Sequence, residues 1–176
     1  MKKIILLILI PLFSQTGFSQ NVDELIEKGN NLIQSKNVNE AINVYSKAID
    51  LDPNSSEAYF KRGEAYFLSE NDKSAVEDYN KSISIDSLNP KVYFMRGQSN
   101  NYLGNKGDAL NDYSRAINLD SNYIPPYIKR GYLLLSSGSH EAAFVYFTTA
   151  IEKDAKQPAD VYFARGYCYQ QYKAYD

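Results

Sequence analysis

Apolar residues recur every three or four positions along most of the chain, as in YSKAIDL and DYSRAINL. This spacing is typical of a helix with one buried face. Segments rich in Gly, Pro, Asn and Ser, such as SKN, PNSS, SEND and SSGS, interrupt the pattern. They recur roughly every 17 residues, so the pattern predicts helices of about 14 residues joined by short turns.

A glycine recurs at a fixed interval within this pattern. Gly29, Gly63, Gly97 and Gly131 are each 34 residues apart, and Gly166 follows after 35. The positions twelve residues later hold Ala41, Ala75, Ala109 and Ala143, and the positions sixteen residues later hold Tyr45, Tyr79, Tyr113 and Phe147. Such columns indicate a repeated structural unit of two helices.

The glycines fall in the middle of the predicted helices. Glycine there costs up to about 1 kcal/mol relative to alanine, so a structural reason is expected. We predict that each glycine lets the first helix of a unit approach the second closely. The expected contact is with the alanine twelve residues later, as between Gly97 and Ala109.

The predicted fold is an all-α solenoid of about 4.5 units. Four complete units are expected at residues 22–55, 56–89, 90–123 and 124–158, and a partial unit at 159–176 supplies a first helix at about 159–172. The whole array spans 20–176.

These columns resemble the tetratricopeptide repeat (TPR) family, whose helix-turn-helix unit has 34 residues. The resemblance covers residues 22–176 and implies a right-handed superhelix with the first helices on its concave face. The sequence departs from the family at the closing proline, which is present as Pro53 but replaced by Ser87, Ser121 and Ala155. Turns based on Asp and Ser are expected instead. Asn100 replaces a core residue, which predicts a softer third unit unless Asn100 finds a partner.

The resemblance implies that three columns on the first helices face a ligand, namely the positions three before, one after and four after each glycine. The implied partner-binding residues are Ile26, Asn30, Phe60, Glu64, Phe67, Phe94, Gln98, Ile128, Tyr132, Phe163 and Tyr167. The implied partner is a protein or peptide. The alternative is that the aromatic side chains in these columns serve packing alone.

Some members of the family grip the C-terminal carboxylate of heat-shock proteins with a clamp of Lys, Asn and Arg. The matching positions here hold Ile26, Asn30, Lys61, Lys91 and Met95. Only Asn30 and Lys91 agree with the clamp, so the sequence does not favour that role.

Arginine precedes four of the repeated glycines, at Arg62, Arg96, Arg130 and Arg165. Asp78 lies sixteen residues beyond Arg62, and Asp112 lies sixteen residues beyond Arg96. An ion pair between the two helices of a unit is one interpretation, and a solvated arginine is the other.

No residue pattern points to catalysis. The chain has one histidine, His140, and one cysteine, Cys168, so neither a metal-ligand set nor a nucleophile–base pair can be assembled from these types. Cys168 is expected in the core, and His140 is expected at the turn before a second helix. We expect no enzyme activity, cofactor or metal. The net charge of -2, with no basic run, argues against nucleic acid.

The N-terminal segment MKKIILLILIPLFSQTGFSQ has two lysines, an apolar run from Ile4 to Phe13, and the small residues Gly17 and Ser19. This is the arrangement of a secretory signal peptide, here residues 1–19. The apolar run is much shorter than the roughly 20 residues that span a bilayer. An exported protein, periplasmic or extracellular, with no membrane span after cleavage is therefore expected.

Two interpretations of function remain open at this point. The first is an exported scaffold that holds a partner segment in its concave groove. The second is the TPR region of a larger exported protein, such as a cell-envelope assembly factor, a sensor or an enzyme. The helix at 159–172 has no second helix to cover it, which favours either a longer chain or a homodimer through this end.

The signal-peptide hypothesis predicts that the mature protein begins at Gln20. Gly17 and Ser19 are the well-placed small residues after the apolar run, and signal peptidases require small residues there. Intact-mass measurement of the exported protein checks this. A full-length precursor that stays in the cytosol would contradict both the cleavage and the export.

Overall fold

The computed structural model describes residues 15–173, which form α-helices and no strands. The helices are α1 (Gln15–Gln34), α2 (Val38–Leu51), α3 (Ser56–Leu68), α4 (Asp72–Ile85), α5 (Pro90–Tyr102), α6 (Lys106–Leu119), α7 (Pro125–Ser136), α8 (His140–Lys153) and α9 (Ala159–Lys173). Residues 1–14, most of the predicted signal peptide, lie outside the described part. The predicted cleavage site lies within α1.

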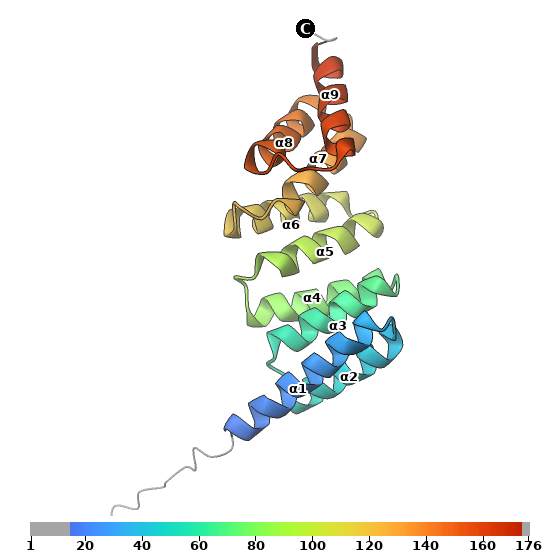
Figure 1. The fold of residues 1–176 in the computed structure, drawn as a ribbon, viewed down its shortest axis with the longest axis vertical. Coiled ribbons are helices and arrows are strands. Elements are labelled where there is room, and N and C mark those ends of the chain that lie inside the picture. Colours follow the sequence, from blue (N-terminus) through green and yellow to red (C-terminus); the bar gives the residue numbers. More distant parts are fainter. Residues whose placement is uncertain (1–14, 174–176) are drawn as a thin grey trace, which may run out of the picture.

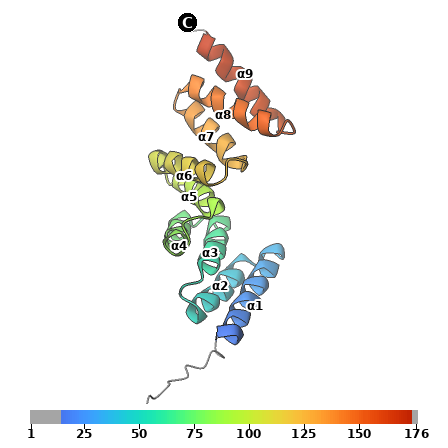
Figure 2. The same cartoon turned by 90° about the vertical axis from the view of Figure 1, so that its left-hand side faces the viewer.

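Consecutive helices pack in pairs, α1 with α2, α3 with α4, α5 with α6 and α7 with α8. The pairs stack in chain order along the long axis (Figure 1). The two ends of the stack are formed by α1 with α2 and by α9 (Figures 1 and 2). The predicted all-α repeat solenoid is confirmed.

The turns between units are built on a column of aspartates. Asp52, Asp86, Asp120 and Asp154 each follow a second helix and accept a hydrogen bond from the backbone N–H two residues later, at 2.8–2.9 Å. This geometry fixes a turn without proline. The expectation of Asp-based turns is confirmed, and it holds even in the first unit, which has Pro53.

The turns within units use a second column in the left-handed region of backbone space. Gly104 and Gly138 have φ values of 83° and 75°, and Lys36 and Glu70 occupy the equivalent turns with φ of 62° and 60°. A side chain at positive φ is disfavoured relative to glycine. The first two turns therefore carry a local cost that the third and fourth avoid.

Each repeated glycine with a following helix lies against an aromatic ring. A Cβ atom placed on Gly97 would be 2.7 Å from Cε1 of Tyr113, and one on Gly131 would be 2.8 Å from Cε1 of Phe147. The same holds for Gly29 with Tyr45 and Gly63 with Tyr79. The predicted close approach is therefore real, but its partner is the aromatic sixteen residues later and not the alanine twelve residues later.

The arginines link three helices. Arg96 on α5 donates from Nε and Nη2 to the Asp112 carboxylate on α6, at 3.0 and 2.6 Å, and from Nη1 to Asn80 on α4 at 2.7 Å. Arg62 bonds Asp78 on α4 and Ser46 on α2 in the same way. The interhelical ion pair is confirmed in the second and third units. The bond to Asp78 raises the pKa of Arg62.

The fourth unit has no aspartate at the equivalent position, where Tyr146 stands instead. The Arg130 guanidinium lies 4.9 Å from the centroid of the Tyr146 ring, a cation–π contact. It also donates to the backbone oxygen of Leu110 at 2.5 Å and to the Ser114 hydroxyl on α6. The link between neighbouring units is therefore kept, although the ion pair within the unit is lost.

The Asn100 side chain has a hydrogen-bond partner, which was the condition that the sequence left open. Its side-chain amide donates to Asp112 Oδ2 at 3.1 Å, and the residue is 6% exposed. The amide thus completes the hydrogen bonding of a buried carboxylate, which is costly to leave unpaired. The condition for a softer third unit is not met.

We predict that Gly97→Ala lowers the free energy of unfolding by about 1–3 kcal/mol, because its Cβ would overlap the Tyr113 ring, and that Gly97→Leu lowers it further. Gly166 provides the matched control. No heavy atom lies within 4 Å of a Cβ placed there, so Gly166→Ala should stabilise α9 by up to about 1 kcal/mol. Thermal unfolding of dilute protein measures all three variants. Equal melting of the Gly97→Leu variant and the wild type would contradict the contact.

We also predict energetic coupling between Arg96 and Asp112. Their side chains are 22% and 6% exposed, so removing one partner leaves a poorly solvated charge. A double-mutant cycle with alanine should give a coupling of at least about 1 kcal/mol. The more exposed pair of Lys61 and Glu64 is the control, with coupling below about 0.5 kcal/mol. Equal coupling in the two cycles would contradict the structural role of the buried pair.

Candidate functional site

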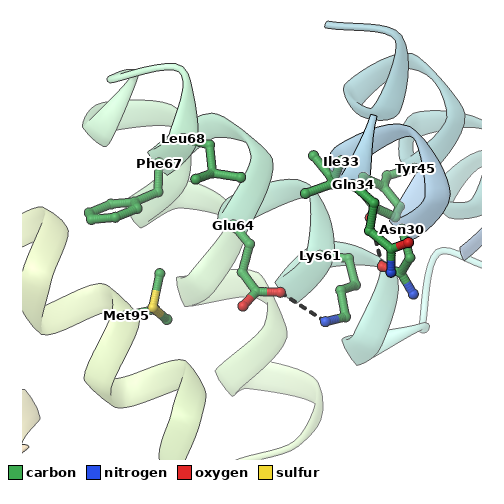
Figure 3. Close-up of a pocket in the computed structure, with 9 residues that line it drawn as sticks. All are labelled: Asn30, Ile33, Gln34, Tyr45, Lys61, Glu64, Phe67, Leu68 and Met95. Atoms are coloured by element: carbon green, nitrogen blue, oxygen red, sulfur yellow. Dashed lines mark hydrogen bonds and ion pairs between the residues drawn. The ribbon is translucent and has the colours of Figure 1, made fainter. Parts of the chain in front are cut away.

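A cavity of about 450 Å³ lies between the first helices of the first three units, α1, α3 and α5 (Figure 3). Its lining residues are Asn30, Ile33, Gln34, Tyr45, Lys61, Glu64, Phe67, Leu68 and Met95. Tyr45 comes from the second helix α2, and all the others come from first helices. Side chains far apart in sequence therefore meet here only because the helix pairs stack.

One wall of the cavity is apolar. Phe67 and Leu68 at the end of α3 lie near Met95 of α5, and Ile33 lies on the α1 side (Figure 3). Leu68 is 55% exposed, which is high for a large aliphatic side chain. Burial of such side chains by a ligand is favourable, so this wall suits an apolar group of a partner.

The polar groups of the cavity are held by hydrogen bonds. The buried Tyr45 hydroxyl donates to Asn30 Oδ1 at 2.8 Å and so orients this amide. Burial, with smaller effects of Glu64 and Glu57, raises the pKa of Tyr45 to about 12, so the phenol stays protonated as a donor. Lys61 Nζ lies 2.9 Å from Glu64 Oε2, one turn along α3. The cavity thus offers fixed amide and charged groups beside an apolar wall.

Three of the residues predicted to bind a partner meet in this cavity, namely Asn30, Glu64 and Phe67. The other predicted residues divide into three sets. Gln98, Ile128 and Tyr132 are half-buried on α5 and α7, Phe163 and Tyr167 are exposed on α9, and Ile26, Phe60 and Phe94 are buried. The predicted residues therefore do not form one continuous binding surface in the structure.

Phe60 and Phe94, which the resemblance places in the ligand-facing columns, are in fact buried. They are 7% and 8% exposed, because the ring of Phe60 packs 6.1 Å from that of Tyr79, and the ring of Phe94 packs 6.0 Å from that of Tyr113. Each phenylalanine thus packs against the second helix of its own unit. Replacing either one by alanine would remove core packing as well as any partner contact.

Sequence reasoning missed Gln34, Tyr45 and Leu68 as cavity residues, and it considered Lys61 and Met95 only as positions of a clamp that the sequence did not favour. Gln34 and Leu68 lie one position beyond the columns used, at the C-terminal ends of α1 and α3. Their place in the cavity depends on how the helix pairs stack, which the repeat columns do not show. Tyr45 was identified only as part of a repeated structural column. Its ring is buried, and its hydroxyl donates to Asn30 at the cavity.

A second cavity of about 520 Å³ shares Phe67 and Leu68 with the first and adds Glu70, Asp72 and Tyr102. The rings of Phe67 and Tyr102 lie 5.7 Å apart, and Tyr102 is 68% exposed. The apolar wall therefore continues from the concave cavity to the turns that follow α3 and α5. Two carboxylates border this extension.

A third cavity, of about 410 Å³, is polar and is lined by Val76, Asn80, Arg96, Asn100, Asp108, Asn111 and Asp112. Arg96, Asn100 and Asp112 already bond one another or Asn80 across three helices. These charged and amide groups therefore hold the stack together, and we assign the third cavity a structural role.

Within residues 15–173, no group of three His, Cys, Asp or Glu side chains lies in an arrangement that would hold a metal ion. None of the helices described has both the length and the apolar character needed to cross a bilayer. Cys168 is buried as predicted, and burial raises the pKa of its thiol. His140 begins α8, where its ring stacks edge-on against Tyr167.

The paired helices, the glycine–aromatic contact and the concave cavity together define a helical-repeat protein with a ligand-sized groove. The family can be given more narrowly. A TPR repeat model matches residues 29–70, and a tetratricopeptide repeat model matches residues 56–87 and 90–123. Together they cover more than half of the chain, which belongs to the tetratricopeptide repeat family.

Solved structures with the same fold include the MamA protein, with a TM-score of 0.80 and 24% identity over 88% of this chain and 84% of MamA. YrrB, described as a TPR protein with an unusual peptide-binding site, aligns with a TM-score of 0.73 and 24% identity over 89% of this chain and 84% of YrrB. The first TPR domain of Spaghetti (RPAP3), bound to an HSP90 peptide, aligns with a TM-score of 0.67 and 28% identity over 68% of this chain and 95% of that domain.

Proposed function

We propose that this protein is an exported interaction scaffold that binds a segment of a partner protein in the cavity between α1, α3 and α5. The observation that carries the proposal is the composition of this cavity. An exposed apolar wall faces amide and charged groups that hydrogen bonds already hold in place. Pockets that are largely apolar, with a few fixed polar groups, are the usual form of a binding site.

The cavity suggests the chemistry of the segment. An aliphatic or aromatic side chain fits the wall formed by Phe67, Leu68 and Met95, and backbone amides of an extended segment pair with Asn30 and Gln34. The ion pair of Lys61 and Glu64 is partly exposed, at 27% and 33%, so both partners remain accessible to charged groups of a ligand.

The comparisons support peptide binding as a mode of action for this fold. The printed descriptions of YrrB and of the Spaghetti domain both mention a peptide, and both chains share the stacked helix pairs. Export is supported by the N-terminal pattern of Lys2 and Lys3, an apolar run and a small-residue site.

We predict that the wild-type protein enriches a consensus motif with at least one large apolar residue from a random peptide display library. The double variant Phe67→Ala and Gln34→Ala should lower the affinity for these peptides at least about tenfold, because it removes an aromatic side chain and an amide that line the cavity. Fluorescence anisotropy with the selected peptides measures the loss.

Val145→Ala is the matched control for this experiment. Val145 is 54% exposed on the second helix α8, away from the cavity, so its replacement should leave peptide affinity unchanged. Circular dichroism must show equal helicity for all variants. If the selected peptides bind the cavity variant as tightly as the wild type, the cavity is not the binding site.

A further inference from the structure

The apolar wall of the first cavity continues into the second cavity at the ends of α3 and α5. The two cavities share Phe67 and Leu68, and the second adds Tyr102. Figure 3 shows Phe67 and Leu68 at one edge of the first cavity. Leu68 is 55% exposed and Tyr102 is 68% exposed, although both lie within the array, with a helix pair on either side of their own. Large apolar side chains that lie together on a surface mark a place of interaction.

These exposed side chains do not belong to the repeated framework of the fold. Leu68 and Tyr102 occupy equivalent positions, 34 residues apart, at the ends of α3 and α5. The same position holds Gln34 in α1 and Ser136 in α7. The first and fourth units form the same helix pairs with polar residues there, so the packing of a unit does not require an apolar side chain at this position. The apolar surface is therefore particular to the second and third units, as is expected of a binding site.

Two carboxylates without a cationic partner border the second cavity. Glu70 lines it from the turn after α3, and Asp72 lines it from the start of α4. Within residues 15–173 the ion pairs are formed by other carboxylates, so Lys36 and Lys106 on the neighbouring turns pair with neither of these two. One oxygen of Asp72, Oδ1, also has no hydrogen-bond partner. A cation that enters this cavity is therefore attracted by negative charge that the described part of the chain leaves unpaired.

The chain itself shows which group fits between a carboxylate and an aromatic ring. The guanidinium of Arg96 pairs with the Asp112 carboxylate and lies 5.5 Å from the centroid of the Tyr93 ring. Arginine suits both contacts, because its planar group forms paired hydrogen bonds with a carboxylate and stacks on an aromatic face. The second cavity presents the same two kinds of partner. Its carboxylates lie beside the rings of Phe67 and Tyr102, whose centroids are 5.7 Å apart.

We propose that the second cavity binds a basic side chain, arginine in preference to lysine, of the same partner segment whose apolar side chain enters the first cavity. This inference rests on the proposed function, because the two cavities share one wall. A sphere of either volume is about 10 Å across, a distance that about three residues of extended chain cover. The partner motif is therefore a large apolar residue with an arginine or lysine about three residues away.

The peptide selection described above tests this motif, because the enriched sequences should contain a basic residue about three positions from the apolar one. A selected peptide is then compared by fluorescence anisotropy with a copy that has glutamine in place of the basic residue. The double variant Glu70→Gln and Asp72→Asn should bind the basic peptide at least about tenfold more weakly than the wild type. Its affinity for the glutamine peptide should stay within about twofold, which would not be the case if the fold were damaged.

Glu70 also allows a test in which stability and binding change in opposite directions. Its φ of 60° favours glycine, which occupies the equivalent turns as Gly104 and Gly138. Glu70→Gly should therefore melt at a higher temperature than the wild type and yet bind the basic peptide at least about threefold more weakly. Lys36→Gly is the matched control. It relieves the same disfavoured conformation, at a φ of 62°, and should raise the melting temperature without weakening the binding.

A second control separates this site from general attraction between charges. Glu141→Gln with Glu152→Gln removes the same charge from exposed positions on α8 and should change the affinity by less than about twofold. An equal loss in this control and in the cavity variant would overturn the inference. Selected peptides that lack a basic residue, or that bind the neutralised cavity as tightly as the wild type, would overturn it and leave the proposed function intact. If no peptide is enriched, the proposed function fails and the inference fails with it.

Discussion

The fold depends on one contact, in which the aromatic ring of a second helix lies against the glycine of the first. The ring atoms of Tyr45, Tyr79, Tyr113 and Phe147 occupy the space that any side chain at the glycine would need. These rings are at most 1% exposed, so they form the centre of each unit. The glycine lowers helix propensity, but it lets a large apolar ring be buried, and that burial contributes more than the lost propensity costs.

The arginine links connect these units into a stack. Because Arg62 and Arg96 each bond the second helix of their own unit and that of the preceding unit, the angle between neighbouring pairs is fixed by hydrogen bonds as well as by apolar packing. Buried ion pairs add specificity more reliably than they add stability, and bidentate arginine geometry is directional. The relative placement of α1, α3 and α5, on which the concave cavity depends, follows from this arrangement.

The sequence was sufficient for the architecture and insufficient for the cavity. The helices, the turns and the glycine–aromatic unit repeat with a fixed period, so they are visible as columns. The exposure of Phe60 and Phe94 was misjudged because a column says which residues are equivalent and not how deeply the second helix covers them. Leu68 and Gln34 could not be assigned to the cavity from the sequence. Whether a residue lines the cavity depends on the distance between helices of different units, and the periodicity of the sequence carries no information about that distance.

Repeated positions along the chain serve the structure of each unit, and positions that differ between units are the ones available for function. Positions that recur in every unit, such as the glycine and its aromatic partner, are buried by contacts within the unit. Little of their surface is therefore accessible to a ligand. Positions that vary from unit to unit, such as Asn30, Glu64 and Gln98 directly after the glycines, differ in charge and hydrogen bonding. Specificity for a partner must therefore reside in the varied positions, since a uniform surface would bind in several registers equally well.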